Sequence, residues 1–589
     1  MPKNFEKIIL FLLLAIFAGL NLYLAATDSQ TIDEGPHISA GYSYWLTGNY
    51  LLNPEHPPLV KLFAALPLLF FRPQLSIDYP SLAENNEWSF GRAFIYHNNI
   101  NADIIIFTAR IFPIILGLIL GYFIYKWAKE LWGTKGGLLA LFLYALSPNF
   151  LGHSHLVTTD VPLTLFFLLS IYYFGQYLKN PSRLRLITAA VMFSFAMLTK
   201  YSAFILIPIL VSLYFVNWLI GRQNSRQGFK KFIKVFLVFF GVTSVLIFVF
   251  YRFEFKKPID DPRVQKLYQQ RTEIIANDQE NNQLPLNHFL LGIGDPEKPI
   301  GKFLYRFANV VPVPAYTYWQ GLFSVLSHNA NGHGAYLLGE ARNFGWWYYF
   351  IIAFLVKTPT VTIILFFSSI IYVIYRIIKN IKTFQSLGTR LKSIPFDYYL
   401  IALPPFIYFA WSLTSHLNLG VRHIFPIYPL VFIVAASFIK LTAWSPRLKY
   451  LGRYTLYALL LFYLIGNILS FPSYLAYFNG LIGGSNQGYK YLSDSNLDWG
   501  QDIKRLKIYL EENKIKEFHS LLFGSLEANY YIKGEITMPD NQAVEKSAPQ
   551  KGYYVISATV LFDPTRNYTW MQNYHPIKII GHSIYIYKF

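Results

Sequence analysis

The sequence predicts an all-α polytopic membrane protein that carries a small α/β domain at its C-terminal end. Of the 589 residues, 54% are hydrophobic and only 14% are charged, whereas a soluble domain carries about 25% charged residues. The apolar residues form blocks long enough to cross about 30 Å of hydrocarbon. In addition, every second short loop between these blocks is basic, which is the charge pattern of a protein that crosses a membrane many times.

Ten apolar blocks are expected to form the spans. They lie at 8–26, 104–125, 136–151, 161–178, 186–220, 232–251, 346–375, 398–414, 423–441 and 454–472. The block 186–220 is longer than one span requires, so it is interpreted as a hairpin with Lys200 at its turn. The sequence therefore predicts about eleven transmembrane helices.

The positions of the basic residues predict the orientation of these helices. Lys3 and Lys7 precede the first block, and basic clusters follow every second span after it. Because cytoplasmic loops are enriched in Lys and Arg, we expect a cytoplasmic N-terminus and an extracytoplasmic C-terminus. The formal net charge of +19 is then a topology signal, and nucleic acid is not an expected partner. The chain has no cysteine, which excludes disulfides and Cys-ligated metals.

The outer side is expected to receive the long segments, and function is expected there because the cytoplasmic connectors are short. We divide the chain into a transmembrane catalytic domain at 1–475 and an extracytoplasmic α/β domain at 476–589. The outer segments of the first domain are the loops 27–103 and 252–345. The patterning predicts helices at 57–71 and 500–512 and strands at 520–524, 553–559 and 584–589.

The first outer loop contains the residues best suited to chemistry. Asp33 and Glu34 stand a few residues beyond the first span, within TIDEGPHISAGYSYW. Two adjacent acids outside a membrane place one of them where a general base acts at the interface. A bare Asp-Glu pair is more often a solvated loop. The segment GNYLLNPEHPPLVKLF then follows, with His56-Pro57-Pro58 and Lys61.

This combination resembles the protein O-mannosyltransferases, which are polytopic glycosyltransferases of the GT-C class that use polyprenyl-phosphate sugars. The bacterial aminoarabinose transferase that modifies lipid A is a more distant relative. The resemblance implies a GT-C transmembrane domain with Asp33 as catalytic base beside Glu34, and with His56 and Lys61 in the substrate pocket. It extends over about the first 475 residues. The sequence has no room for the β-trefoil insert of the eukaryotic members, which puts a protein acceptor in doubt.

Three cations at outer span ends are candidates for binding the donor phosphate: Arg110, Lys200 and Arg422. The leaving phosphate gains about one negative charge as the glycosidic bond breaks, and fixed cations stabilise that charge without a metal. No cofactor is therefore required, although a divalent cation is left open. The alternative for these residues is snorkelling of the side chains to the membrane interface.

Further candidates for the substrate pocket are Asp160, His333, Glu340 and His423. Asp160 begins the fourth span, where capping of the helix is the alternative role. His333 and Glu340 lie in a segment rich in Gly and Asn, which is interpreted as a lid over the sugar. The residues 494–505 begin like a calcium loop, but Gly500 is one place late and Arg505 stands where a Glu is required. No metal site is predicted.

The sequence thus predicts an integral protein of the plasma membrane that transfers a single sugar, a mannose-like hexose or a pentose. The donor is a polyprenyl phosphate, the acceptor hydroxyl lies outside the cytoplasm, and the anomeric configuration is inverted. Membrane lipids and a protein, glycan or lipid acceptor are the other expected partners. The alternatives are a transporter or lipid flippase and a polymerase of the O-antigen type. A transporter should have ionisable residues within its spans and broken helices in paired halves, which this sequence does not show.

Overall fold

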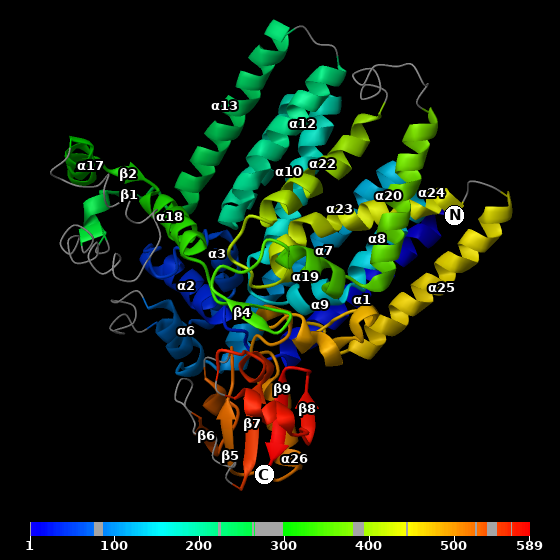
Figure 1. Ribbon diagram of the computed structural model, residues 1–589. Coiled ribbons are helices and arrows are strands. Elements are labelled where there is room, and N and C mark those ends of the chain that lie inside the picture. The colour runs from blue at the N-terminus through cyan, green and yellow to red at the C-terminus, as the bar shows by residue number, and fades with distance from the viewer. Residues whose placement is uncertain are drawn as a thin grey trace.

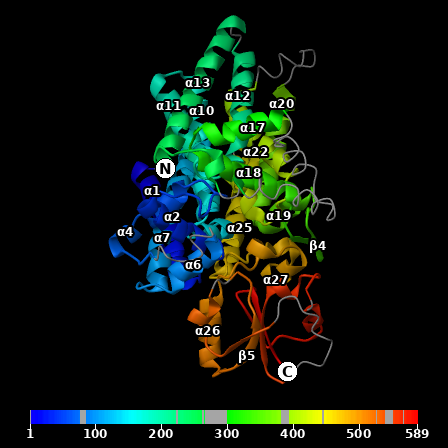
Figure 2. The ribbon, with the colours of Figure 1, turned by 90° about the vertical axis from the view of Figure 1, so that its left-hand side faces the viewer.

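The computed structural model describes most of the chain. The described residues are 2–75, 86–221, 225–261, 264–265, 299–380, 394–442, 446–524, 527–538, 551–566 and 568–589. A large helical part contains nearly all of the apolar blocks, and a small sheet formed by the last part of the chain lies at one end of it (Figures 1 and 2).

Among the described residues, seven helical segments are long and apolar enough to cross a membrane. Four of them come before residue 221: Asn4–Thr27 of α1 (Lys3–Thr27), α7 (Ala102–Trp132), α10 (Asp160–Lys179), and Tyr201–Ile220, which comprises η1 (Tyr201–Ile205) and α12 (Leu206–Ile220). The other three are Gln227–Phe250 of α13 (Ser225–Phe250), Val421–Leu441, which comprises η3 (Val421–Ile427), α23 (Tyr428–Ala436) and most of α24 (Phe438–Thr442), and Gly452–Ser470 of α25 (Pro446–Ser470). The bent pair α19 (Tyr349–Lys357) and α20 (Thr360–Asn380) brings the number to eight if it counts as one span. The chain is therefore an integral membrane protein by the length and composition of its helices.

The expected count of about eleven spans is not confirmed. Every predicted block is helical, but α8 (Thr134–Ala145), α11 (Arg183–Met197) and α22 (Phe396–Ser412) have 12, 15 and 17 residues, fewer than the roughly 20 that a span needs. The block 346–375, expected as one span, turns by 111° between α19 and α20. Pro359 stands at this break, and proline has no N–H group to continue a helix.

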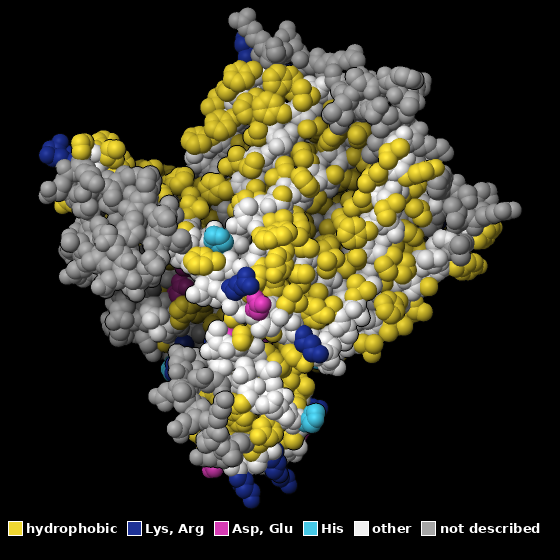
Figure 3. Space-filling model, viewed as in Figure 1, with side chains coloured by type: hydrophobic (Ala, Val, Ile, Leu, Met, Phe, Trp, Pro, Cys, Tyr) yellow, Lys and Arg dark blue, Asp and Glu magenta, His cyan; other side chains and the backbone are white. Residues whose placement is uncertain are grey.

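The helix α10 lies at the centre of the helical part, in contact with α7, α11 and η3. Its residues are mostly buried, whereas α13 and α25 are mostly exposed and form the periphery. Figure 3 shows hydrophobic side chains covering the outer faces of the peripheral helices, with few charged side chains among them. This is the surface that a lipid environment requires.

The first outer loop folds into a helical layer of α2 (Glu34–Thr47), α3 (Leu59–Ala65), α4 (Leu68–Phe71) and α6 (Glu87–Tyr96). The expected helix at 57–71 is confirmed as α3 and α4. The layer is packed closely enough that a Cβ atom on Gly41 of α2 would lie 2.0 Å from the backbone oxygen of Lys61. Glycine at this position is what allows the two helices to touch.

The second outer loop contains α17 (Pro299–Val310), α18 (Tyr316–Asn331), one short pair of strands from distant parts of the loop and one hairpin. The strand β1 (Phe255–Lys256) pairs with β2 (Val313–Pro314), and β3 (Ala335–Leu337) pairs with β4 (Glu340–Arg342). The remaining short elements are α9 (Pro148–His153), η2 (Pro258–Asp260), η4 (Gly480–Ile482), η5 (Ser485–Lys490), η6 (Asp494–Asn496), η7 (Ala528–Tyr530), α27 (Ala558–Leu561) and η8 (Thr569–Asn573).

The C-terminal part forms a five-stranded mixed sheet in the order β6-β5-β7-β9-β8, with α26 (Ile503–Glu512) packed beside it. The helix predicted at 500–512 and the strands predicted at 553–559 and 584–589 are confirmed as α26, β7 (Tyr553–Ser557) and β9 (Ile584–Lys588). The strand predicted at 520–524 is found two residues earlier, as β5 (Phe518–Leu521). Two strands were missed, β6 (Glu535–Thr537) and β8 (Lys578–Ile580), because three residues are too few for an alternating pattern to be recognised.

Candidate active site

Four charged side chains from distant parts of the chain meet near the ends of helices. Arg422 Nη1 lies 3.0 Å from Asp33 Oδ2 and 3.5 Å from Asp160 Oδ2, and Lys200 Nζ lies 2.7 Å from Asp160 Oδ1. We call Asp33, Asp160, Lys200 and Arg422 the charged cluster. Two carboxylates and two cations alternate in it, so their formal charges balance.

The local backbone explains why these side chains converge. Asp33 follows the end of α1 and is the N-cap residue of α2, while Asp160 is the first residue of α10. Lys200 has an extended conformation at the break between α11 and η1, which confirms the predicted turn of the hairpin. Arg422 stands in η3. Each residue thus lies at an element end, and the packing of the helices brings the four ends together.

The members of the cluster differ in their access to solvent. The side chain of Asp160 is 2% exposed, and those of Arg422 and Lys200 are 10% and 12% exposed, whereas that of Asp33 is 21% exposed. Asp160 binds both cations, and the N-cap residue of its helix is Thr159. Asp33 is therefore the carboxylate of the cluster that a second molecule reaches most easily.

The adjacent acid, Glu34, has a different environment. Its side chain and that of Arg110 are both fully buried, and they form a two-pronged ion pair with distances of 2.9 and 2.7 Å. Burial by itself raises the pKa of Glu34, but the charge and hydrogen bonds of Arg110 lower it below its ordinary value overall. Backbone N–H groups of Thr31 and Val157 complete its hydrogen bonds. Glu34 is thus held in a buried ion pair with Arg110, and its expected catalytic role stays a prediction.

Arg110, which is predicted to bind the donor phosphate, lies in a buried hydrogen-bond network. Its guanidinium donates to both oxygens of Glu34 and to the backbone oxygens of Ala25, Asp28 and Ser29. A guanidinium has five N–H groups, and these five bonds use all of them. Arg110 therefore ties the end of α1 and the start of α2 to α7, and it has no donor left for a lipid phosphate.

Buried imidazoles surround the charged cluster. The rings of His37 and His56 lie 5.3 Å apart, and His37 Nδ1 is 2.8 Å from the backbone oxygen of Val157. Burial lowers the pKa of both histidines, so both are neutral near pH 7. Among the described residues, His56 Nδ1 and His423 Nε2 are buried without a hydrogen-bond partner. Such atoms are suited to accept or donate to a bound ligand.

Lys61 has a structural position. Its ammonium is fully buried and donates to Asn53 O, Asn53 Oδ1 and His56 O at 2.5, 2.8 and 2.6 Å. Burial lowers its pKa to about 7. An ammonium has three N–H groups, so these bonds occupy all of them. Lys61 thus holds the turn that contains His56, and its assignment to the substrate pocket stays a prediction.

The two candidates in the second outer loop, His333 and Glu340, have different environments. His333 Nδ1 lies 3.1 Å from His328 Nε2, and burial together with the charges of His328 and Arg422 lowers its pKa. Glu340 in β4 is 61% exposed and pairs with Arg342 at 2.7 Å. The charge of Arg422 thus influences His333, whereas the carboxylate of Glu340 is exposed on the hairpin of β3 and β4. The assignment of Glu340 to the substrate pocket stays a prediction.

Two residues that contact the cluster were missed by sequence reasoning. Ser495 Oγ accepts a hydrogen bond of 3.1 Å from Arg422 Nε, and the ring of Trp499 lies 4.1 Å from the guanidinium carbon. Both stand in the segment that resembled a calcium loop. Across the described ranges, no group of three or more His, Cys, Asp or Glu side chains is arranged to hold a metal ion.

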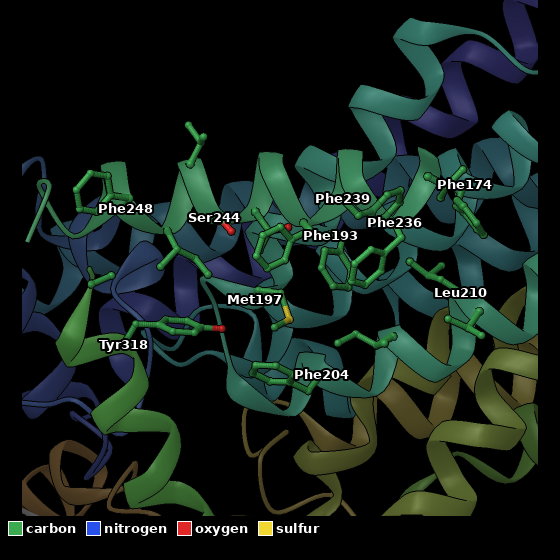
Figure 4. Close-up of a pocket in the computed structure, with 18 of the residues that line it drawn as sticks. Phe174, Phe193, Met197, Phe204, Leu210, Phe236, Phe239, Ser244, Phe248 and Tyr318 are labelled. Atoms are coloured by element: carbon green, nitrogen blue, oxygen red, sulfur yellow. The ribbon is translucent and has the colours of Figure 1, made fainter. Parts of the chain in front are cut away.

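An apolar cavity of about 650 Å³ lies between α11, α12 and α13 (Figure 4). Phe193 and Met197 of α11, Phe204 of η1, Phe239 of α13 and Tyr318 of α18 line it. Met197 and Phe204 flank the turn that carries Lys200, so the cavity and the cation share one segment of chain. Its lining is almost entirely hydrophobic, which suits it to a hydrocarbon ligand.

Residues 100–251, roughly a quarter of the chain, match the family model described as dolichyl-phosphate-mannose-protein mannosyltransferase. An uncharacterized protein of Aquifex aeolicus (strain VF5) is 25% identical over 162 residues, which cover 27% of this chain and 32% of that relative. The matched part thus spans about a third of the relative's length.

Several solved structures are similar to this chain. ArnT from Cupriavidus metallidurans bound to undecaprenyl phosphate has a TM-score of 0.44 and 11% identity, with coverage of 100% of this chain and 98% of that one. The Archaeoglobus fulgidus oligosaccharyltransferase AglB, in complex with an inhibitory peptide and a dolichol phosphate, has a TM-score of 0.45 and 13% identity, with coverage of 98% and 72%. The S. cerevisiae Pmt1-Pmt2 complex bound to the sugar donor has a TM-score of 0.32 and 19% identity, with coverage of 43% and 34%.

These structural similarities are weak, and the ligands named for these solved structures belong to those proteins. The family-model match is independent of them and covers α7 to α13, the helices that provide Asp160 and Lys200. Residues 100–251 of this chain are thus similar to the dolichyl-phosphate-mannose-protein mannosyltransferases, in agreement with the resemblance of the first outer loop to that family.

Proposed function

We propose that this protein is a membrane glycosyltransferase that transfers one sugar from a polyprenyl phosphate to an acceptor hydroxyl outside the cytoplasm, with inversion at the anomeric carbon. The sugar is a mannose-like hexose or a pentose. The charged cluster carries the proposal, because it combines a partly exposed carboxylate, Asp33, with two cations, Lys200 and Arg422, within a few ångströms.

The transfer step assigns one task to each member of the cluster. An Asp33 carboxylate oxygen accepts the proton of the acceptor hydroxyl as its oxygen attacks the anomeric carbon from the face opposite the phosphate. The bond from that carbon to the phosphate oxygen breaks, and the polyprenyl phosphate leaves with one additional negative charge. Lys200 and Arg422 stabilise this charge.

Both cations retain hydrogen-bonding capacity for this task. In the described part of the chain, Lys200 Nζ donates only to Asp160, and Arg422 Nη2 makes no hydrogen bond. Asp160 is nearly inaccessible and binds both cations, so its task is to orient them. The unpartnered nitrogens of His56 and His423 are candidates for contacting the sugar or the acceptor.

The apolar cavity is assigned to the polyprenyl chain of the donor. It lies between α11, α12 and α13 and begins beside the turn that holds Lys200. A lipid with its hydrocarbon tail in this cavity would have its phosphate near Lys200. This placement explains why two residues that line the cavity, Met197 and Phe204, stand on either side of Lys200 in the sequence.

A transporter is the second candidate, and one observation favours it. The pair α19 and α20 is bent by 111°, and Lys357 at the bend is fully buried, with Nζ donating to backbone oxygens of Leu475 and Asn496. Broken helices and buried ionisable residues are features of transporters. The bent pair is a single feature without a repeated partner among the described helices.

Transfer of radiolabelled sugar from polyprenyl phosphates tests the proposal, with membranes that contain wild-type protein or Asp33→Asn. We expect the substitution to reduce transfer by at least about 10²-fold, because general-base catalysis contributes that much or more. Asp397→Asn is the matched control, since Asp397 pairs with Lys179 far from the cluster. Undiminished transfer by Asp33→Asn would refute the assignment of the base, and no transfer by wild type from any such donor would favour the transporter.

A further inference from the structure

The loop between α1 and Asp33 is bonded to the C-terminal part of the chain. The backbone N–H of Ser29 donates to Gln501 O at 2.9 Å, and that of Ile32 donates to Trp499 O at 3.2 Å. The backbone N–H of Lys504 in turn donates to Ser29 Oγ at 2.8 Å. Residues 28–32 have no regular secondary structure of their own. Their conformation, and with it the position of Asp33, therefore depends on this contact.

The same C-terminal segment also contacts Arg422, the ion-pair partner of Asp33. Ser495 Oγ accepts from Arg422 Nε at 3.1 Å, and Asn496 Oδ1 accepts from the backbone N–H of Val421 at 2.9 Å. Trp499 packs its ring against the guanidinium of Arg422. Asp33 and Arg422 are 389 residues apart in the chain, yet both are supported by residues 495–501.

Arg505 connects this segment to the end of α1. Its guanidinium forms ion pairs with Asp28 and Asp502. Asp28 is 4% exposed, and although burial by itself raises its pKa, the charge of Arg505 is the largest of the influences that lower it overall. Asp502 accepts a hydrogen bond of 2.6 Å from Ser583 Oγ, directly before β9. Arg505 thus links the loop before Asp33 to the C-terminal sheet.

We propose that residues 495–505 are a positioning segment for the Asp33–Arg422 ion pair, and that Arg505 is its positioning residue. The inference rests on the proposed function in one respect, namely that this ion pair acts in sugar transfer. None of the positioning residues needs to touch a reactant. Their effect is to fix the positions of the base, Asp33, and the cation, Arg422, relative to each other. A displacement of about 1 Å at a reacting group lowers the rate about 10²-fold.

Steady-state kinetics of the purified full-length protein tests this role. We expect Arg505→Met to lower kcat for transfer by about 10- to 100-fold while the KM for the donor changes little, because the donor-binding groups remain. Arg505→Lys should recover part of the loss, since an ammonium keeps the charge but cannot engage two carboxylates in the same way. Lys507→Met is the control on the same helix, because Lys507 is 43% exposed and pairs only with Glu511. An unchanged kcat in Arg505→Met would overturn the proposal.

A double-mutant cycle with Asp28→Asn separates positioning from general damage. If Arg505 acts through Asp28, the double variant should lose no more activity than the worse of the two single variants. Arg505→Met leaves the buried carboxylate of Asp28 with His155 Nε2, 3.2 Å away, as its ion-pair partner. Asp28→Asn removes that buried charge, so the double variant tests the role if the single variant does not fold. Losses that multiply in the double variant would overturn the role of the Asp28 contact.

Hydrogen exchange provides a readout that does not depend on sugar transfer. The amides of Ser29 and Ile32 should be protected in the wild type and should lose protection in Arg505→Met, while the amides of α7 and α10 keep theirs. Unchanged protection of residues 29–32 would overturn the positioning role. If the wild type transfers no sugar, the proposed function fails, and the exchange result still decides whether Arg505 holds the loop.

Discussion

At the scale of single residues, the charged cluster separates groups that are available to a ligand from groups that are already satisfied. Lys200 and Arg422 each keep N–H groups without a partner in the described part of the chain. Arg110 and Lys61 have none left. Charge alone does not distinguish these four cations, whereas the count of their hydrogen bonds does.

Lys200→Met is expected to lower kcat for transfer by about 10²-fold, because it removes one cation that stabilises the leaving phosphate. Lys200→Arg should retain more activity, since the charge stays at the same turn. Lys179→Met is the control at the opposite ends of the helices, where Lys179 pairs with Asp397. Equal rates for Lys200→Met and the control would exclude Lys200 from phosphate binding.

Glu34→Gln is expected to lower the stability of the folded protein. It leaves the buried charge of Arg110 without its partner, which costs about 3–5 kcal/mol. The folded-state pKa of Glu34 is below its ordinary value. Its contribution to stability is therefore present above that ordinary value and is lost as the pH falls through the lowered folded-state pKa.

Thermal unfolding in detergent as a function of pH checks this expectation. The wild type should lose Tm steeply below about pH 5, and Glu34→Gln should start lower and decline less. Glu340→Gln is the matched control, because Glu340 forms an exposed pair with Arg342, and such pairs contribute about 1 kcal/mol or less. A Tm for Glu34→Gln equal to that of the control would contradict the structural role of the buried pair.

At the scale of elements, close approach of α2 to α3 determines where Asp33 and His56 stand. A Cβ atom on Gly41 would meet the backbone oxygen of Lys61 at 2.0 Å. Gly41→Ala should therefore force the two helices apart and lower stability by about 1–3 kcal/mol. Gly19→Ala on α1 is the control, since nothing lies within 4 Å of that position. The free energies of unfolding of the two variants are compared from their unfolding curves. Equal values would show that α2 and α3 can move apart without loss of stability.

The apolar cavity makes a second prediction at this scale. Ser244→Phe places a bulky side chain in the cavity from α13 (Figure 4). It should raise the KM for a long-chain polyprenyl donor by about 10-fold, the equivalent of about 1.4 kcal/mol, and should affect a short-chain donor little. Gly241→Phe on the same helix is the control, because that position faces open space. Equal effects on both donors would exclude the cavity as the site of the lipid chain.

At the scale of the whole molecule, the basic loops predict which face of the membrane each terminus occupies. The chain has no cysteine, so single-cysteine variants can be labelled without background. In intact cells, a membrane-impermeant maleimide should label Glu512→Cys at the end of α26 and should not label Lys7→Cys near the N-terminus. The reverse pattern would invert the proposed topology and would place the charged cluster on the cytoplasmic side.

Much of the fold and part of the site could be predicted from the sequence, because some properties are local. Apolar length marks the helices, basic residues mark one face, and the alternation in the C-terminal part marks three of its five strands. The positions of Asp33, Asp160, Lys200 and Arg422 at element ends were likewise predicted. The span count was not, since helices of 12 to 17 residues and the bend at Pro359 depend on how neighbouring helices pack.

The sequence by itself therefore determined that this is a membrane protein and that acids and cations stand at the ends of its helices. Only the tertiary structure decided how they pair. Arg110 is bound to Glu34 and Arg422 to Asp33, although the sequence presents both arginines as equal candidates. Likewise, Ser495, Trp499 and Arg505 acquire a role only when the C-terminal segment packs against the loop before Asp33. The physical reason is that pairing depends on distances between residues far apart in the chain, and those distances are set by packing.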